Sequence, residues 1–330
     1  MWWRSVIWIG VIFGILTWII PNILWVVSWF AGKLFNCKIP YAPFGLTALI
    51  IVLIVWGSLA YGHFIGRFQT EVNNVEYASQ EVPEAFDGYR IVHISDMHAD
   101  SFEDSEDLQK VINEVNAQNA DIILFTGDMS TGSMDGMVKH EAVLKQLRAK
   151  EGVMSILGNH DFFIYDRELH NDNERCAAAD RLAKYEESVL GWHVLRNDSY
   201  IINKEKDSIA IAGVDNINGG QGFRTIQKGD LKKAMSKVDK AFTVFMTHDP
   251  SHWKAEVLPR SHAQITLSGH THAAQVRLFG WSLANLSFNE CDGLYDSDGR
   301  MLYVNAGIGC TAPFRIGCPS EITVITLRHK

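Results

Sequence analysis

The stretch RIVHISDMH, residues 90–98, decides the fold, because a short apolar run ends abruptly in a carboxylate and an imidazole. Ile91, Val92 and Ile94 predict a buried β-strand over 90–95. Asp96 and His98 follow that strand directly. They are two positions apart, with Met97 between them, and such an i, i+2 pair at the end of a strand points to the same side. The sequence therefore predicts two metal-binding or catalytic side chains at one strand end.

Four other apolar runs end in the same way. Strands are expected over 121–126, 153–157, 242–247 and 264–267, and each is followed by Asp, Asn or His. The side chains concerned are Asp128, Asn159, His160, His248, His270 and His272. Because the carboxyl ends of strands line one crevice in open α/β folds, we expect these loops to converge. Glycines at 127, 158 and 269 allow the loops to turn tightly.

The segments between these strands predict an α/β sandwich with mixed sheets. Leu108, Val111, Ile112 and Val115 have the spacing of one helix face, and further helices are expected over 137–149, 166–189 and 230–238. Residues 193–214 are typical of antiparallel strands, and the turn Asp296–Gly299 predicts a hairpin. A purely parallel sheet does not fit these segments.

Charge and hydropathy divide the chain in two. Of its 330 residues, 47% are hydrophobic and 21% are charged, which excludes a disordered or collagenous chain. Residues 1–61 contain Arg4, Lys33 and Lys38, no Asp or Glu, and seven of the ten Trp. Since the whole chain carries −8, the remainder carries −11. The sequence therefore predicts a membrane region joined to an acidic soluble domain, and no nucleic-acid-binding surface is expected.

We expect about two transmembrane helices within residues 1–62. Residues 43–61 are uncharged and long enough to span a bilayer, whereas 5–32 form either one helix kinked at Pro21 or a shallow hairpin. The first stretch is too long for a cleaved signal peptide. Residues 63–88 turn polar and contain Pro83 and Gly88, which predicts a linker.

The expected side of the membrane rests on the cysteines. Arg4 and Arg67 at one face balance Lys33 and Lys38 at the other, so the positive-inside rule gives a tie. The five cysteines are odd in number and show no C-x-x-C spacing, which favours free thiols and a reducing compartment. We therefore expect the soluble body on the cytoplasmic side.

The polar residues at the strand ends have the composition of a catalytic metal site. Asp96, Asp128 and Asn159 offer oxygen, His98, His248, His270 and His272 offer nitrogen, and no thiolate is among them. Such a set suits Mn, Fe, Zn or Co. Seven ligands are too many for one ion that keeps a position open, so two ions are expected, about 3.5–4 Å apart. Asp96 or Asp128 taken alone would be interpreted as a cap of the turn at the strand end.

The ordered motifs D-x-H, G-D, G-N-H-D, H and G-H-x-H resemble the calcineurin-like metallophosphoesterase superfamily over residues 89–330. The apolar N-terminal region and the stretch PEAFDGYRIVHISDMHADSF, residues 83–102, resemble its bacterial, membrane-associated, YkuE- and YaeI-like branch. This resemblance implies a membrane-anchored domain at the bacterial inner membrane that hydrolyses phosphoric esters.

The resemblance also implies roles for individual residues. One metal would be held by Asp96, His98, Asp128 and His272, and the other by Asp128, Asn159, His248 and His270, with Asp128 as the bridge. His160 would face the substrate and donate a proton to the leaving oxygen, while a metal-bridging hydroxide attacks phosphorus. Asp161 would orient the loop. Arg315, in a segment similar to the family's closing motif P-x-R-x-G-x-P-x-E-I, would contact phosphate.

Two departures from the family pattern bear on the substrate and on the site. Met129–Gly132 follow Gly127–Asp128 without the Arg of the protein phosphatases, which argues against a protein-phosphatase activity. Ala273 and Ala274 stand where this branch often has two glycines, which affects the room near the metal. Asp249 is interpreted as a cap of the turn before Pro250.

Three hypotheses follow. The first is a phosphodiesterase or pyrophosphatase, with manganese, iron or zinc, that acts on a lipid-linked phosphate at the bilayer surface. The second is a phosphodiesterase or monoesterase for soluble nucleotides that is only tethered to the membrane. The third is a non-catalytic membrane scaffold, which ranks last because all the expected ligand positions are intact.

Overall fold

The computed structural model describes residues 2–220 and 225–330. It divides into two compact units, one of residues 1–68 and 312–317 and the other of residues 69–311 and 318–330. We call them the membrane unit and the catalytic unit, and each is described by itself.

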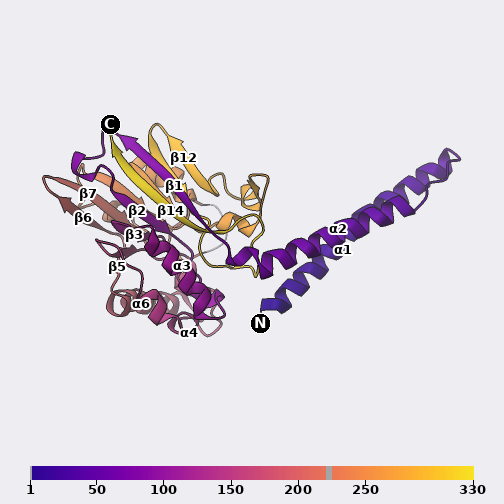
Figure 1. Ribbon diagram of the computed structural model, residues 1–330, viewed down its shortest axis with the longest axis horizontal. Helices are drawn as coiled ribbons and strands as arrows, with labels where there is room; N and C mark the ends of the chain where they lie inside the picture. The colour runs from indigo at the N-terminus through magenta and orange to yellow at the C-terminus, as the bar shows by residue number, and fades with distance from the viewer. Residues whose placement is uncertain (1, 221–224) are drawn as a thin grey trace. The chain divides into compact units, whose positions relative to one another are not determined.

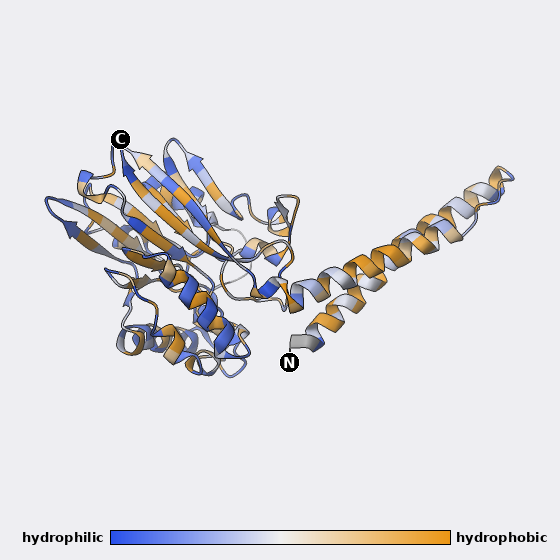
Figure 2. Cartoon of the chain, viewed as in Figure 1, coloured by the Kyte–Doolittle hydropathy of each residue, from blue (hydrophilic) through white to orange (hydrophobic). Residues whose placement is uncertain are grey.

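The membrane unit is a pair of long apolar helices, α1 (Trp2–Leu34) and α2 (Ala42–Phe64), followed by a short turn, η1 (Gly66–Phe68). Both are long and apolar enough to cross a membrane. Most of their length is coloured white to orange in Figure 2, whereas helix α3 (Ser105–Ala117) carries many blue polar positions. Residues 5–32 therefore lie in one helix that contains Pro21, and the alternative of a shallow hairpin within them is excluded.

Contacts between the two helices explain how they pair. The Tyr41 hydroxyl, just before α2, donates a hydrogen bond of 2.9 Å to Asn22 Oδ1 in α1, and its ring packs edge-on against Trp25. The absence of a side chain at Gly10 gives room to the Trp56 ring of α2, which would lie 2.7 Å from an added Cβ. A small residue facing a large one is a usual way for membrane helices to approach closely.

The catalytic unit contains two six-stranded mixed sheets (Figure 1). The first sheet has, in spatial order, β1 (Thr70–Ser79), β14 (Ser320–His329), β2 (Arg90–Ile94), β3 (Ile122–Phe125), β4 (Val153–Ser155) and β5 (His193–Val194). The second has β12 (Gly293–Ser297), β13 (Arg300–Val304), β9 (Ile265–Ser268), β8 (Phe242–Met246), β7 (Asp207–Gly213) and β6 (Asp198–Lys204). Strands β2 to β5 run parallel in the first sheet, as do β7, β8, β9 and β13 in the second.

The apolar core forms three layers. Side chains of both sheets, such as Ile91, Leu124, Val244 and Leu267, share one buried cluster, so the sheets pack face to face. Outside the first sheet, a second cluster is covered by α3 and by α6 (Asp172–Tyr185). Outside the second sheet, a third is covered by α7 (Leu231–Ala234) and the turn Trp253–Val257, which leads into α8 (Leu258–Arg260). The expected α/β sandwich with mixed sheets is confirmed.

Helix α3 shows how the sequence sets local structure. The Asp104 side chain caps it by accepting hydrogen bonds from the N–H groups of Glu106 and Asp107. Leu108, Val111, Ile112 and Val115 are all buried, as their spacing predicts.

Two expected elements differ in the structure. The helix expected over 137–149 is replaced by two single turns, α4 (Asp135–Val138) and α5 (Glu141–Leu144), because the chain bends at His140. The buried His140 ring lies 2.8 Å from Ser105 Oγ and 3.2 Å from the Phe102 carbonyl oxygen. Residues 193–194, expected in an antiparallel sheet, instead form β5 beside β4 and parallel to it. The hairpin expected around Asp296–Gly299 is present as β12 and β13.

Residues 63–88, expected as a linker, contain an integral part of the first sheet. Strand β1 pairs with β14 along its whole length, with Val72 opposite Ile322. Phe86 follows in a short turn and is fully buried against Tyr89. The sequence conceals β1 because its few apolar residues, such as Val72 and Val75, do not alternate regularly with polar ones, and the strand lies at the edge of the sheet.

Phe86→Ala tests whether this segment belongs to the folded core. A buried Phe replaced by Ala is expected to lower the free energy of unfolding by about 3–5 kcal/mol. Gln80→Ala, an exposed position of the same segment, is the control and should change it by less than about 0.5 kcal/mol. The measurement is thermal unfolding of the full chain in detergent. If both variants are equally stable, residues 63–88 are a linker and not part of the folded core.

Candidate metal centre

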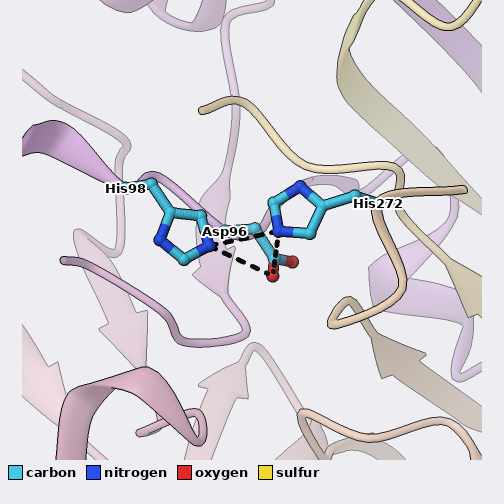
Figure 3. A group of neighbouring side chains, drawn as sticks. All are labelled: Asp96, His98 and His272. Atoms are coloured by element: carbon cyan, nitrogen blue, oxygen red, sulfur yellow. Dashed lines mark hydrogen bonds and ion pairs between the residues drawn. The ribbon is translucent and has the colours of Figure 1, made fainter. Parts of the chain in front are cut away.

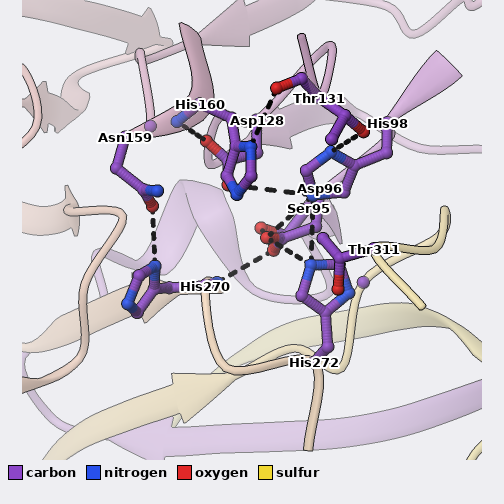
Figure 4. Close-up of polar contacts among 12 residues, drawn as sticks. Ser95, Asp96, His98, Asp128, Thr131, Asn159, His160, His270, His272 and Thr311 are labelled. Atoms are coloured by element: carbon purple, nitrogen blue, oxygen red, sulfur yellow. Dashed lines mark hydrogen bonds and ion pairs between the residues drawn. The ribbon is translucent and has the colours of Figure 1, made fainter. Parts of the chain in front are cut away.

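The loops after β2, β3, β4, β8 and β9 meet at one edge of the sandwich and bring the predicted residues together (Figure 4). Five of these residues, Asp96, His98, Asp128, His270 and His272, have positive φ between 37° and 72°. That conformation is unfavourable for residues other than glycine, and residues that adopt it cluster at functional sites. The backbone strain at this edge therefore coincides with the predicted site.

Asp96, His98 and His272 form the first group of polar side chains (Figure 3). His272 Nε2 lies 3.2 Å from Asp96 Oδ1 and 3.1 Å from His98 Nε2. All three residues are buried. The second carboxylate oxygen, Asp96 Oδ2, accepts hydrogen bonds from the Ser95 hydroxyl and from the His270 N–H at 2.9 Å. These bonds hold the carboxylate so that Oδ1 faces the two imidazoles.

Asp128, Asn159, His248 and His270 form the second group. His248 Nε2 lies 3.1 Å from both Asp128 Oδ2 and Asn159 Oδ1. His270 Nδ1 lies 2.8 Å from Asn159 Oδ1 and 3.3 Å from His248 Nε2. Asp128 Oδ2 is also 3.8 Å from His98 Nε2, so one carboxylate oxygen faces both groups.

The chemistry of this pocket fits bound cations. Asp96 Oδ1 is buried and, among the described residues, accepts no hydrogen bond, although two imidazole nitrogens lie within 3.9 Å of it. Burial lowers the pKa of His98 well below its usual value, and the neighbouring His272 lowers it further. Burial acts the same way on His248, but the Asp128 carboxylate outweighs it and raises the pKa of His248 to about 10. A pocket that holds lone pairs together and attracts positive charge is suited to a dinuclear metal site.

Outer contacts fix the imidazole orientations. His248 Nδ1 donates a hydrogen bond of 2.7 Å to the Thr126 carbonyl, which turns Nε2 toward the pocket. His98 Nδ1 lies 3.0 Å from Thr131 Oγ1, so its Nε2 is also turned inward.

Asp249 serves both as a turn cap and as a partner of His270. Its Oδ1 accepts hydrogen bonds from the Ser251 N–H and hydroxyl, which is the turn cap that the sequence predicts. Its Oδ2 lies 3.6 Å from His270 Nε2. This second contact was not predicted from the sequence, because the turn cap alone accounts for an Asp before Pro250.

Asp161 binds the two loops after β3 and β4 together. Its buried carboxylate accepts three hydrogen bonds, from the N–H groups of Asp128 at 2.7 Å, Met129 at 2.8 Å and Gly158 at 2.8 Å. Burial and the Asp128 carboxylate raise the pKa of Asp161 to about 7, whereas the three N–H donors oppose that rise. The contacts agree with an orienting role.

Two glycines permit the close approach of these loops. A Cβ atom at Gly158 would lie 2.2 Å from Asp128 Oδ1, and one at Gly269 would lie 2.2 Å from Asp96 Oδ2. Any side chain there would push a carboxylate out of place.

The segment 305–310 completes the pocket and was missed by the sequence analysis. The Gly309 N–H donates to the Asp96 carbonyl at 2.8 Å, and an added Cβ at Gly307 would lie 2.8 Å from Asp96 Cβ. The Gly-x-Gly of AGIGC is the signal that could have revealed it, since close backbone approach requires such residues.

His160 stands at the border of the pocket. Its backbone N–H donates to Asp128 Oδ1 at 2.8 Å, and its Nδ1 donates to the Thr131 carbonyl at 3.0 Å. The ring is partly exposed and packs against the rings of His98 and Tyr165. Tyr165 in turn lines a groove of about 850 Å³ together with His170 and Arg175. His160 also lies close enough to His98 and Asp128 to share a cation with them, and its predicted contact with a substrate stays a prediction.

Arg315 belongs to the membrane unit rather than to the catalytic unit. It is fully buried, and its N–H donates to the Gly62 carbonyl of α2 at 3.2 Å. The contact of Arg315 with phosphate stays a prediction.

A buried set of carboxylate, amide and imidazole ligands at the strand ends of a two-sheet sandwich defines a metal-dependent phosphoric ester hydrolase. The sequence model described as "Calcineurin-like phosphoesterase" matches residues 89–274. The chain belongs to this family, as its motifs indicate.

Three relatives have similar sequences. The uncharacterized metallophosphoesterase YkuE of Bacillus subtilis is 29% identical over 84% of this chain and 92% of its own length. The "Transmembrane protein with metallophosphoesterase domain" of Danio rerio is 28% identical over 85% of this chain, which spans 62% of that protein. The "UDP-2,3-diacylglucosamine pyrophosphatase LpxG" of Chlamydia muridarum is 25% identical over 72% of this chain and 83% of its own length. The predicted YkuE-like branch is confirmed.

Asp161→Asn tests the orientation of the metal-binding loops. The amide NH₂ would face a backbone N–H, so at least one of the three hydrogen bonds is lost. We expect metal affinity or activity to fall about 10–100-fold, as is typical for residues that orient ligands. Asp166→Asn is the control, because it lies in the same loop region and its carboxylate accepts a hydrogen bond from the exposed Glu168 N–H rather than from the metal-binding loops. Unchanged metal binding in Asp161→Asn would contradict the orienting role.

Ala274→Gly tests the strain after His272. Ala273 and Ala274 both have φ of 49°, where the sequence comparison with the family placed glycines. The left-handed conformation disfavours Ala by about 1–2 kcal/mol, part of which glycine's extra freedom in the unfolded state offsets. We expect the exposed variant Ala274→Gly to stabilise the protein by up to about 1 kcal/mol in thermal unfolding. Ala177→Gly, exposed in α6, should destabilise it by a similar amount. If Ala274→Gly also lowers the stability of the protein, the backbone at Ala274 is not strained.

Proposed function

We propose that this protein is a membrane-anchored phosphodiesterase or pyrophosphatase that binds two divalent metal ions, Mn, Fe or Zn, and acts on a lipid-linked phosphate. The observation that carries the metal pair is that Asp128 Oδ2 faces both ligand groups, at 3.1 Å from His248 Nε2 and 3.8 Å from His98 Nε2. A carboxylate shared in this way is how two ions are held side by side.

Each group would hold one ion. Asp96, His98, Asp128 and His272 would bind the first, and Asp128, Asn159, His248 and His270 the second. When bound, the ions supply Lewis acidity to the phosphoryl oxygens and lower the pKa of water. The protein's own contribution is the fixed orientation of the imidazoles and the exclusion of bulk water by burial.

His160 would act as the proton donor to the leaving oxygen. Its Nδ1 proton is held by the Thr131 carbonyl, so a second proton on Nε2 is the one it can transfer. Arg315 is a candidate contact for a phosphate oxygen, since a guanidinium suits that role.

A lipid-linked substrate is supported by two observations. Both α1 and α2 can span a bilayer, and the catalytic unit begins at residue 69, directly after η1. A relative of similar sequence is named for a pyrophosphatase activity on a diacylated nucleotide sugar. A protein-phosphatase activity has less support, because no Arg follows Asp128 within Met129–Gly132.

The location we propose is the bacterial inner membrane with the catalytic unit in the cytoplasm. Cys37, Cys176, Cys291 and Cys310 are free thiols, as a reducing compartment requires. The domain division we propose keeps residues 1–62 in the membrane and assigns hydrolysis to residues 89–330, to which strand β1 is added.

Metal content and turnover of the full chain in detergent test the proposal together. We expect near two metal ions per chain by elemental analysis and turnover of bis-p-nitrophenyl phosphate. In His160→Ala, turnover should fall about 10²–10⁴-fold with metal retained, as expected for a general acid. Asp128→Asn should lose metal as well. Less than one ion per chain after supplementation with Mn, Fe and Zn, with no turnover, would favour a non-catalytic scaffold.

A second assay separates the two enzymatic hypotheses. A lipid pyrophosphate in mixed micelles and bis-p-nitrophenyl phosphate are compared by kcat/KM. Preference for the lipid by about 100-fold or more corresponds to about 2.7 kcal/mol and supports a lipid substrate. Equal efficiency supports a soluble nucleotide substrate, with the helices serving only as a tether.

A further inference from the structure

Exposed apolar side chains gather in one short part of the catalytic unit. Nine large hydrophobic residues of its described part are exposed, and five of them lie within nine consecutive residues. These five are Leu278, Phe279, Trp281, Leu283 and Leu286. We call residues 277–286 the apolar hairpin. It consists of β10 (Arg277–Leu278), β11 (Trp281–Ser282) and the turn Leu283–Leu286. Single exposed hydrophobics are ordinary, but such a group marks an interaction surface.

The residue at the tip does not serve folding. Phe279 and Gly280 form the two-residue turn between β10 and β11, and both have positive φ, 53° and 80°. Asn or Gly is preferred at the first of these positions, and a bulky residue is strained there. The Phe279 side chain is 107% exposed, so it gains no burial in return. A strained and fully exposed Phe points to a contact outside the catalytic unit.

The base of the hairpin is fixed to the fold. Arg277 Nη2 and Nε bind the two Asp292 oxygens at 2.7 and 2.8 Å, and Nη1 lies 3.4 Å from Glu71 Oε1. Ser282 Oγ donates a hydrogen bond to the Ala273 carbonyl. These contacts fix the base of the apolar hairpin to the rest of the catalytic unit. Arg277 is the one charged residue between 273 and 288, and its carboxylate partners neutralise it.

The hairpin is also continuous with the metal centre. It begins five residues after His272, and Phe288, two residues beyond it, packs edge-on against His270 with ring centroids 5.6 Å apart. A molecule whose phosphate lies at the metal ligands would therefore find apolar surface on the same stretch of chain.

We propose that the apolar hairpin is a membrane-contact loop that inserts into the lipid interface next to the metal centre. Lipid is the occupant we favour, because this chain carries its own membrane helices and residue 69 of the catalytic unit follows them without a spacer. Residues 273–288 hold Phe, Trp and Leu but no Asp or Glu, which is the composition of an interfacial segment. The acidic remainder of the unit would be repelled by anionic lipid, so this segment is suited to the contact.

Photolabelling of the full chain in vesicles tests this contact. The vesicles contain phosphatidylethanolamine, phosphatidylglycerol and a phosphatidylcholine with a diazirine near the glycerol, and labelled peptides are mapped by mass spectrometry. We expect label on residues 273–288 in the wild type, and a loss of about tenfold or more in the double variant Phe279→Asn, Leu286→Asn. Label on α1 and α2 should be unchanged, which shows that reconstitution succeeded. Leu294→Asn, also exposed and apolar, is the matched control and should leave the label on 273–288 intact.

Other outcomes separate this inference from the proposed function, on whose membrane location it rests. Label on both helices but none on 273–288 overturns the contact, and so does a wild-type hairpin that is shielded by a second copy or a partner protein. Because Asn fits the turn at 279, misfolding of that variant is not expected, and an unchanged rate on bis-p-nitrophenyl phosphate verifies its fold. Label on the hairpin without hydrolysis of any lipid pyrophosphate would support the contact and refute the lipid substrate.

Discussion

The shared position of Asp128 is the constraint on which the rest of the structure depends. Its carboxylate faces imidazoles of both ligand groups, and it is buried with only 1% of its surface exposed. A buried carboxylate needs compensating partners, and here they come from loops far apart in the sequence. His160 and Asp161 contribute to this from the loop after β4, one by a backbone N–H to the carboxylate and the other by accepting the Asp128 N–H.

The two sheets make this arrangement possible. Parallel strands β2, β3 and β4 of the first sheet and β8 and β9 of the second end at the same edge, so five loops supply ligands from two packed layers. Packing the apolar faces together sets the distance between the two sets of loops. Positive φ at five ligand residues then aims the side chains inward, and the stability of the two-sheet core compensates for that strain.

The sequence predicts most of the site because its signals are local. A strand followed by Asp-x-His or Gly-His-x-His places two ligands with few alternatives, and the three expected ligand glycines lie where side chains would collide. The unexpected parts depend on distant contacts. Strand β1 looks polar because it lies at a sheet edge, and α4 and α5 are separated because His140 is buried against Phe102 and Ser105. The apolar hairpin was also missed, because Leu278–Leu286 without the structure resembles an ordinary core segment.

The claim that most needs testing is that one carboxylate joins two metal ions. Electron paramagnetic resonance of the full chain loaded with Mn²⁺ measures this directly, because ions bridged by a carboxylate couple to each other whereas isolated ions do not. We predict the hyperfine pattern of a coupled pair in the wild type, and its loss in Asp128→Asn. A wild-type spectrum of isolated Mn²⁺ at full metal occupancy would contradict the shared role of Asp128.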